Sequence, residues 1–77
     1  MNFNSELMAE MNMLVKFSRS SEMSGLKVHS NADADIIMAT ERLFAKGLVT
    51  DKDGGYLTNL GRDAAEHAKE VLRILVS

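Results

Sequence analysis

The stretch from Arg42 to Arg62, RLFAKGLVTDKDGGYLTNLGR, decides the fold of this chain. A helical pattern ends there at Gly47, a residue that suits a left-handed helix C-cap. Two short β-like segments then flank Asp53-Gly54-Gly55, whose glycines supply the positive φ angles of a tight reversal. A new helical pattern starts at Thr58. The order of helix, hairpin and helix predicts a small α+β domain.

A first helix is expected over Ser5–Phe17, near the N-terminus. Asn4 is suited to cap it, and Phe3 and Met8 occupy the two positions of a hydrophobic staple. Residues at helical spacing predict one apolar stripe, which contains Leu7, Met11, Leu14, Val15 and Ser18, with Met8 beside it. We interpret the methionines of this helix as core residues rather than as an adaptable binding surface.

The next part of the chain is expected to be a loop followed by a short strand. Residues 18–25, SRSSEMSG, are rich in serine and leave room for a single helical turn near Ser21–Met23. Residues 26–29 alternate apolar and polar side chains, which predicts a half-buried strand. This strand would complete a three-stranded sheet if it pairs with one arm of the hairpin, 48–50 or 56–58.

The second helix is predicted to begin with a capping box, Ser30 followed by Asp33. At 100° per residue its side chains divide into an inward and an outward set. The inward set is Ile36, Ile37, Thr40, Leu43 and Phe44. The outward set is Asp35, Met38, Glu41, Arg42, Ala45 and Lys46.

The last helix is expected to start after Thr58 or Asn59 as N-cap and to run nearly to the end of the chain. Its predicted buried stripe is Leu60, Ala64, Ala68, Val71 and Leu75. Toward the C-terminus the apolar arc widens beyond what one neighbouring helix can cover. We therefore expect a homodimer whose interface contains Val71, Leu72, Ile74, Leu75 and Val76.

Length and composition indicate one globular domain that spans residues 1–77, with 45% hydrophobic and 26% charged residues. Cysteine is absent, and there is no export signal or membrane-spanning apolar run, so we expect a cytoplasmic protein without membrane association. The formal net charge is −2. None of the segments 1–30, 31–47, 48–61 and 62–77 is net positive, which argues against a strong nucleic-acid footprint.

No catalytic constellation, cofactor motif or metal-ligand pattern is present in the sequence, so we expect no enzyme activity, no cofactor and no metal. His29 is expected in a loop. His67 is expected to be a partly buried structural residue, with a ligand or a pH switch as the alternative. Asp51 and Asp53 begin a pattern similar to a calcium loop, but the later ligands are missing.

The run LFAKGLVTDKDGGYLTNLGRDAAEHAKEVL resembles the end of a bacterial winged-helix domain. The resemblance rests on the helix-ending pattern from Leu43 to Leu48 and on Leu57–Gly61, which opens the next helix after the hairpin wing. MarR- and PadR-type regulators end their winged domains in this way. The whole chain also resembles a family of short, uncharacterised bacterial proteins that sometimes carry a provisional label of DNA-binding or transcriptional regulatory protein.

The resemblance implies a winged-helix-like α+β domain with three helices, a small antiparallel sheet and a hairpin wing. As a function it implies a DNA-associated transcriptional regulator that contacts double-stranded DNA. Its candidate contacts are Arg42, Lys46 and Lys52, flanked by Lys27 and Arg62. The alternative interpretation of these residues is that they are ordinary solubilising charges.

The second hypothesis is a small dimeric protein–protein interaction module, an adaptor or modulator that does not bind DNA. The first half of a helix-turn-helix is missing or very short, because the serine-rich loop stands where its first helix is required. Asp33 and Asp35 would place carboxylates at the entrance of the recognition helix, near phosphate. The apolar contact surface for a partner would be Met38 with Ala45.

Overall fold

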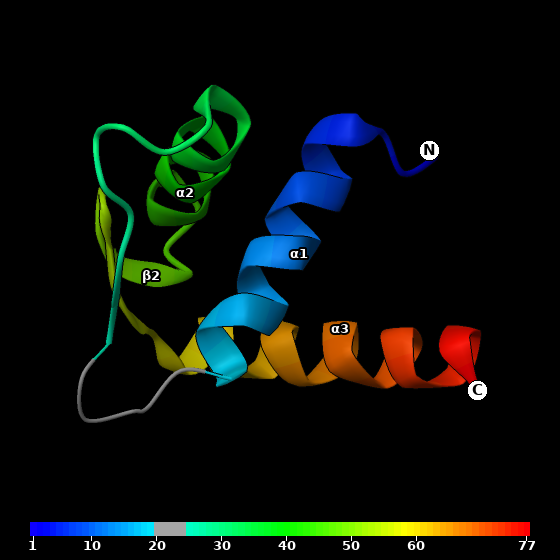
Figure 1. Ribbon diagram of the computed structural model, residues 1–77. Helices are drawn as coiled ribbons and strands as arrows, with labels where there is room; N and C mark the ends of the chain where they lie inside the picture. The colour runs from blue at the N-terminus through cyan, green and yellow to red at the C-terminus, as the bar shows by residue number, and fades with distance from the viewer. Residues whose placement is uncertain (20–24) are drawn as a thin grey trace.

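The computed structural model describes residues 1–19 and 25–77. In order, its elements are α1 (Ser5–Arg19), β1 (Leu26–Lys27), α2 (Ala34–Ala45), β2 (Val49–Asp51), β3 (Gly54–Leu57) and α3 (Asn59–Val76) (Figure 1). Within the described residues these are three helices and a small antiparallel sheet, which confirms the predicted α+β class. Winged-helix identity stays a prediction. The helical turn expected near Ser21–Met23 falls outside the described residues.

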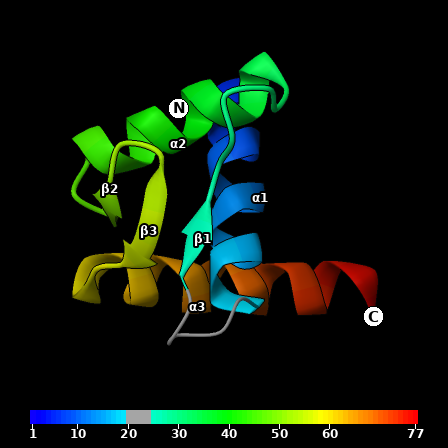
Figure 2. The same cartoon turned by 60° about the vertical axis from the view of Figure 1, so that its left-hand side comes forward.

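The sheet has the order β1-β3-β2, and both pairs of neighbours are antiparallel (Figure 2). The predicted pairing of the first strand with the hairpin is therefore confirmed. Leu26 lies opposite Gly55, and Lys27 lies opposite Gly54. This strand is only two residues long instead of the four expected, although the Val28 N–H still donates a hydrogen bond to the Asp53 carbonyl over 2.8 Å.

The hairpin forms where it was predicted, but its arms and its turn are displaced. The arms were expected at 48–50 and 56–58, whereas β2 and β3 together leave only Lys52-Asp53 for the reversal. Gly54 and Gly55 belong to β3, where they keep positive φ angles of 127° and 82°. The register between β2 and β3 shifts beside them. The glycines therefore serve close strand contact as well as the turn.

Asn4 caps α1 as predicted, because its Oδ1 accepts a hydrogen bond of 2.8 Å from the Leu7 N–H. The helix continues to Arg19, two residues beyond the predicted end. Phe3 and Met8 are 72% and 49% exposed, so a staple between them would bury little surface.

The predicted start of α2 was wrong and its predicted end is confirmed. The helix begins at Ala34 with Asp33 as N-cap, and no side-chain capping bond forms. The N-terminal capping box at Ser30 is replaced by a turn ahead of the helix. At the other end Gly47 has φ 78°, and the Leu48 N–H reaches back to the Leu43 carbonyl over 2.9 Å. This is the hydrogen-bonding pattern of a Schellman C-cap.

Thr58 caps α3 and also ties it to the end of α2. Its Oγ1 accepts a hydrogen bond of 3.0 Å from the Gly61 N–H and donates one of 2.7 Å to the Gly47 carbonyl. The predicted buried stripe of α3 is confirmed at Ala68 and wrong at Leu60, Val71 and Leu75, which are exposed, and the other buried residues are Gly61 and Ala65. The helix lies so close to the body that only its smallest residues fit there.

The hydrophobic core is shared by all three helices, and α1 packs against both α2 and α3. Its most buried cluster is Met13, Leu14, Phe17, Ala39, Leu43, Val49 and Ala65. On α2 the inward face is centred on Ala39, Thr40 and Leu43. Phe44, which was predicted to point inward, is 42% exposed. The N-terminal half of α1 and the C-terminal end of α3 diverge, so both chain termini lie on one side (Figure 1).

Candidate functional site

A buried carboxylate holds the two cations of α2 that the sequence placed on its outer face. Glu10 of α1 is only 5% exposed. It accepts a hydrogen bond of 2.9 Å from Arg42 Nε and a second one from Lys46 Nζ. Arg42 and Lys46 are four residues apart and so lie on the same face of α2. The pairing joins the first two helices across more than thirty positions of sequence.

Arg42 is held at further points of α1. Its Nη2 donates to the Glu6 carbonyl over 3.2 Å, and its Nη1 lies 3.7 Å from the Glu6 carboxylate. We call Glu6, Glu10, Arg42 and Lys46 the Glu10 cluster. Sequence reasoning missed it, although a signal was present: Glu10 falls on the apolar stripe of α1, four residues before Leu14. An acidic residue on a buried stripe needs a positive partner.

The surroundings of Glu10 in this cluster shift the pKa of its carboxyl group. Burial raises the pKa of Glu10, but the hydrogen bonds and positive charges of Lys46 and Arg42 together outweigh burial. The net result is a pKa below the ordinary value for glutamate. Glu10 is therefore ionised at neutral pH and keeps both cations engaged.

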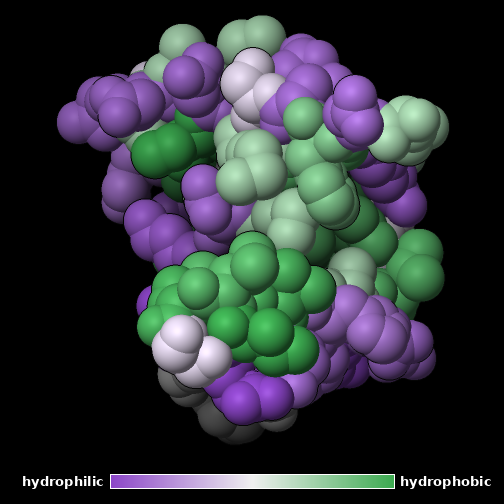
Figure 3. Space-filling view, turned by 90° about the vertical axis from the view of Figure 1, so that its right-hand side faces the viewer, coloured by the Kyte–Doolittle hydropathy of each residue, from purple (hydrophilic) through white to green (hydrophobic). Residues whose placement is uncertain are grey.

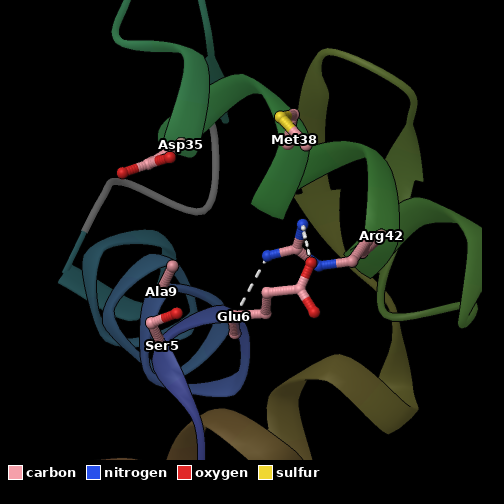
Figure 4. A pocket seen from close by; sticks show the side chains of 6 residues that line it. All are labelled: Ser5, Glu6, Ala9, Asp35, Met38 and Arg42. Carbon is pink, nitrogen blue, oxygen red and sulfur yellow. Dashed lines mark hydrogen bonds and ion pairs between the residues drawn. The ribbon is translucent and has the colours of Figure 1, made fainter.

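A groove between α1 and α2 lies beside the Glu10 cluster (Figure 4). We call it the α1/α2 groove, and it is lined by Ser5, Glu6, Ala9, Asp35, Met38 and Arg42. Met38 is 50% exposed and provides, with Ala9, its apolar surface. Asp35 is exposed and makes no ion pair with any described residue. The groove thus combines a flexible apolar side chain with an unneutralised carboxylate.

A second hollow lies between α2 and the segment around β1, and it brings together two of the predicted DNA contacts. Lys27 and Lys52 both line it, together with His29. Glu41 and Asp53 line the same hollow, so its charges are mixed. Arg62, the last of the five predicted DNA contacts, does not line this hollow. It lies on the first turn of α3, where it donates a hydrogen bond to Asn59 Oδ1 over 2.9 Å.

Comparison with known proteins places this chain in a family. A family model described as a family of unknown function, DUF5669, matches residues 1–76. The chain belongs to DUF5669. No curated protein and no solved structure matches it at a significant level. The resemblance to a short, uncharacterised family is therefore confirmed, while the MarR- or PadR-type relationship stays a prediction.

The predicted dimer residues of this DUF5669 member are all exposed. They are Val71, Leu72, Ile74, Leu75 and Val76, with exposed fractions from 38% to 76%. Figure 3 looks at the side on which α3 ends and shows a continuous hydrophobic area there. The structure thus places the five residues together on one bare helix end.

The described residues contain no metal-binding cluster, and both histidines are exposed. Among residues 1–19 and 25–77, no three His, Asp, Glu or Cys side chains are grouped so that they could hold a metal ion. His29 is exposed as expected, but His67 is also exposed, and its predicted partial burial was wrong. The burial of Ala65 and Ala68 turns the position of His67 away from the body.

Over the same described ranges, no helix has the length and apolar content to cross a bilayer.

Proposed function

We propose that this DUF5669 chain is a protein-interaction module that binds its partner in the α1/α2 groove. The observation that carries the proposal is the half-exposed Met38 beside the unpaired Asp35. Arg42 and Lys46, the α2 cations on which a DNA-binding role would depend, are engaged by Glu10. What α2 leaves free is therefore apolar and acidic surface, which suits a protein partner better than phosphate.

The lining of the groove also indicates the chemistry of the partner. Methionine is unbranched and polarizable, so Met38 can adapt to an aliphatic or aromatic side chain that enters the groove. Asp35, which forms no ion pair with a described residue, favours a positive group beside that side chain. The partner we propose is a protein segment in which an apolar residue stands next to arginine or lysine.

Replacement of Met38 by glutamate is expected to abolish capture of the partner. The substitution places a third carboxylate in the groove and removes its main apolar side chain. The matched control is Ala45→Glu, which adds the same charge to an exposed position of α2 that does not line the groove. Immobilised wild type and Ala45→Glu should recover the same protein from a lysate of the native host, and Met38→Glu should recover at least ten-fold less.

Equal recovery by the two glutamate variants would contradict a partner site in the groove. Recovery of no specific protein by the wild type would contradict the protein-binding proposal as a whole. Circular dichroism of each immobilised variant checks that it is folded. We expect both variants to fold, because Met38 is half exposed and Ala45 is small and exposed.

DNA association is the second candidate function, and one observation favours it. Lys27 and Lys52 line the same hollow, with Lys52 at the tip of the hairpin. Under this candidate, duplex affinity falls steeply with salt, and Lys27→Gln combined with Lys52→Gln reduces the slope of log K against log salt by about 2. Mobility shifts on random duplex DNA over a salt series measure this slope. An unchanged slope would exclude these lysines as phosphate contacts.

Other expectations from the sequence stay predictions. They include a cytoplasmic location and the absence of enzymatic activity. They also include the relationship to winged-helix regulators, for which the order of helix, hairpin and helix provides support. A fold of this kind leaves the function open, because one scaffold serves many activities.

A further inference from the structure

The end of α3 carries an apolar stripe that continues a buried one. In the first turns of the helix, Gly61, Ala65 and Ala68 face the body and are buried. At helical spacing the same stripe proceeds to Leu72 and Leu75. These two residues are 38% and 76% exposed, because α1 diverges from α3 before it reaches them (Figure 1). The described residues therefore leave the C-terminal part of this apolar stripe uncovered.

The bare end of α3 is also free of charge over a wide arc. Val71, Ile74 and Val76 broaden the stripe and are 45%, 57% and 73% exposed. The charged residues of these turns, Glu70 and Arg73, lie opposite the centre of the arc, Leu72 and Leu75, at 100° per residue, and they form an ion pair with each other. A partner at the centre of this arc thus meets aliphatic side chains, and the Glu70–Arg73 pair lies beyond its edges.

We propose that a second copy of this chain covers the arc, with the two α3 ends packed antiparallel about a two-fold axis. The exposed parts of the five side chains amount to about three whole aliphatic side chains, on the order of 500 Å², which is at the upper end for a monomer. Complete burial of this surface in both copies would remove at most roughly 1,000 Å² from water, which is the lower limit of a specific interface. The N-terminal turns of α1 lie toward the same side of the molecule (Figure 1).

A second copy fits this arc because the arc is complementary to itself. A partner with charged groups would have to desolvate them against side chains that offer no hydrogen bond. An identical α3 brings an uncharged arc of the same width, and it leaves each Glu70–Arg73 pair outside the interface in water. None of these residues lines the α1/α2 groove, so the dimer and the proposed partner site are independent of each other.

The test is the mass of the protein in solution, measured by size exclusion with light scattering from micromolar to millimolar concentration. Wild type is expected at twice the chain mass of 8.5 kDa. The double variant Leu72→Lys with Val76→Lys is expected at the mass of one chain. The matched control is Glu70→Lys with Arg73→Lys, which changes the net charge by the same amount on the opposite face of the same turns, and it should remain dimeric.

A monomeric wild type at millimolar concentration overturns the proposal, and so does a dimer that survives Leu72→Lys with Val76→Lys. A mass above two chains excludes closed two-fold packing. Circular dichroism confirms that the variants are folded. Should the double variant unfold, Leu75→Ser replaces it, because Leu75 is 76% exposed, and its dimer is expected to dissociate at concentrations at least ten-fold higher than wild type.

Discussion

Gly54→Ala is expected to remove a large part of the stability of the domain. Gly54 has φ 127°, a backbone conformation that side-chain-bearing residues rarely adopt. A Cβ atom there would lie 2.2 Å from the Leu26 carbonyl oxygen and 3.4 Å from the ring of Phe17. The first of these neighbours is backbone, so β1 would have to move away from β3. We expect a loss of about 3 kcal/mol or more, from a total that for this chain length is roughly 4–12 kcal/mol.

Urea unfolding followed by circular dichroism measures the change, and Gly47→Ala is its control. Gly47 also has a positive φ, 78°, but a Cβ atom added there would meet no other atom within 4 Å. Only the strain of the left-handed conformation remains at this position, about 1 kcal/mol. If the two alanine variants unfold at the same urea concentration, close packing of β1 on β3 does not explain Gly54.

Glu10→Ala is expected to destabilise the domain by about 2–3 kcal/mol, because it removes two charge-assisted hydrogen bonds between α1 and α2. Arg42 and Lys46 are 27% and 48% exposed at their side chains, so water can replace part of what they lose. The control is Glu70→Ala, which breaks an exposed pair on α3 and should leave the unfolding midpoint unchanged. Equal effects at the two positions would contradict a structural role for the Glu10 cluster.

The same cluster predicts a pH dependence with a definite sign. The pKa of folded Glu10 lies below its ordinary value of 4.5, so the unfolded chain binds the proton more readily. The contribution of Glu10 is fully present above the ordinary value and is lost as the pH falls through the lower folded value. When the pH is lowered through this range, the free energy of unfolding of the wild type should therefore fall by more than that of Glu10→Gln. Urea midpoints measured at several acidic pH values record the difference.

Local signals in the sequence predicted the ends of several helices correctly. Asn4, Gly47 and Thr58 act within four residues of their own positions, so their chemistry is visible without the fold. Ser30 was a misleading signal of the same kind, since Asp33 takes the cap position instead. Local patterns thus predicted where α1 and α3 start but not where α2 starts.

Hydrophobic periodicity alone could not predict which face of α3 is buried. Leu60 was expected to point inward, but a Cβ atom at Gly61 would lie 2.0 Å from the Leu48 carbonyl oxygen, so Gly61 is the residue that fits against the body. Such close packing selects Gly61, Ala65 and Ala68 and turns Leu60 outward. The rotation of α3 about its own axis is therefore set by the short distance between the helix and the backbone on which it packs.

The candidate site was misjudged for a similar reason. Arg42 and Lys46 were assigned to an outer face because the sequence of α2 alone does not show where α1 lies. Their partner, Glu10, is 32 and 36 residues away in the chain. Met38 was identified from its place on a polar face, and the structure puts it in the α1/α2 groove. Its suggested companion Ala45 does not line that groove.

Methyl NMR of the protein labelled at its six methionines tests most directly whether the groove is the binding site. The protein captured by wild type and lost with Met38→Glu is titrated into the labelled sample, and random duplex DNA is titrated into a second one. We predict that the Met38 signal shifts and saturates with the protein partner and does not move with duplex. A Met38 signal that stays unchanged at a saturating partner concentration, or that shifts with duplex alone, would contradict the proposed function.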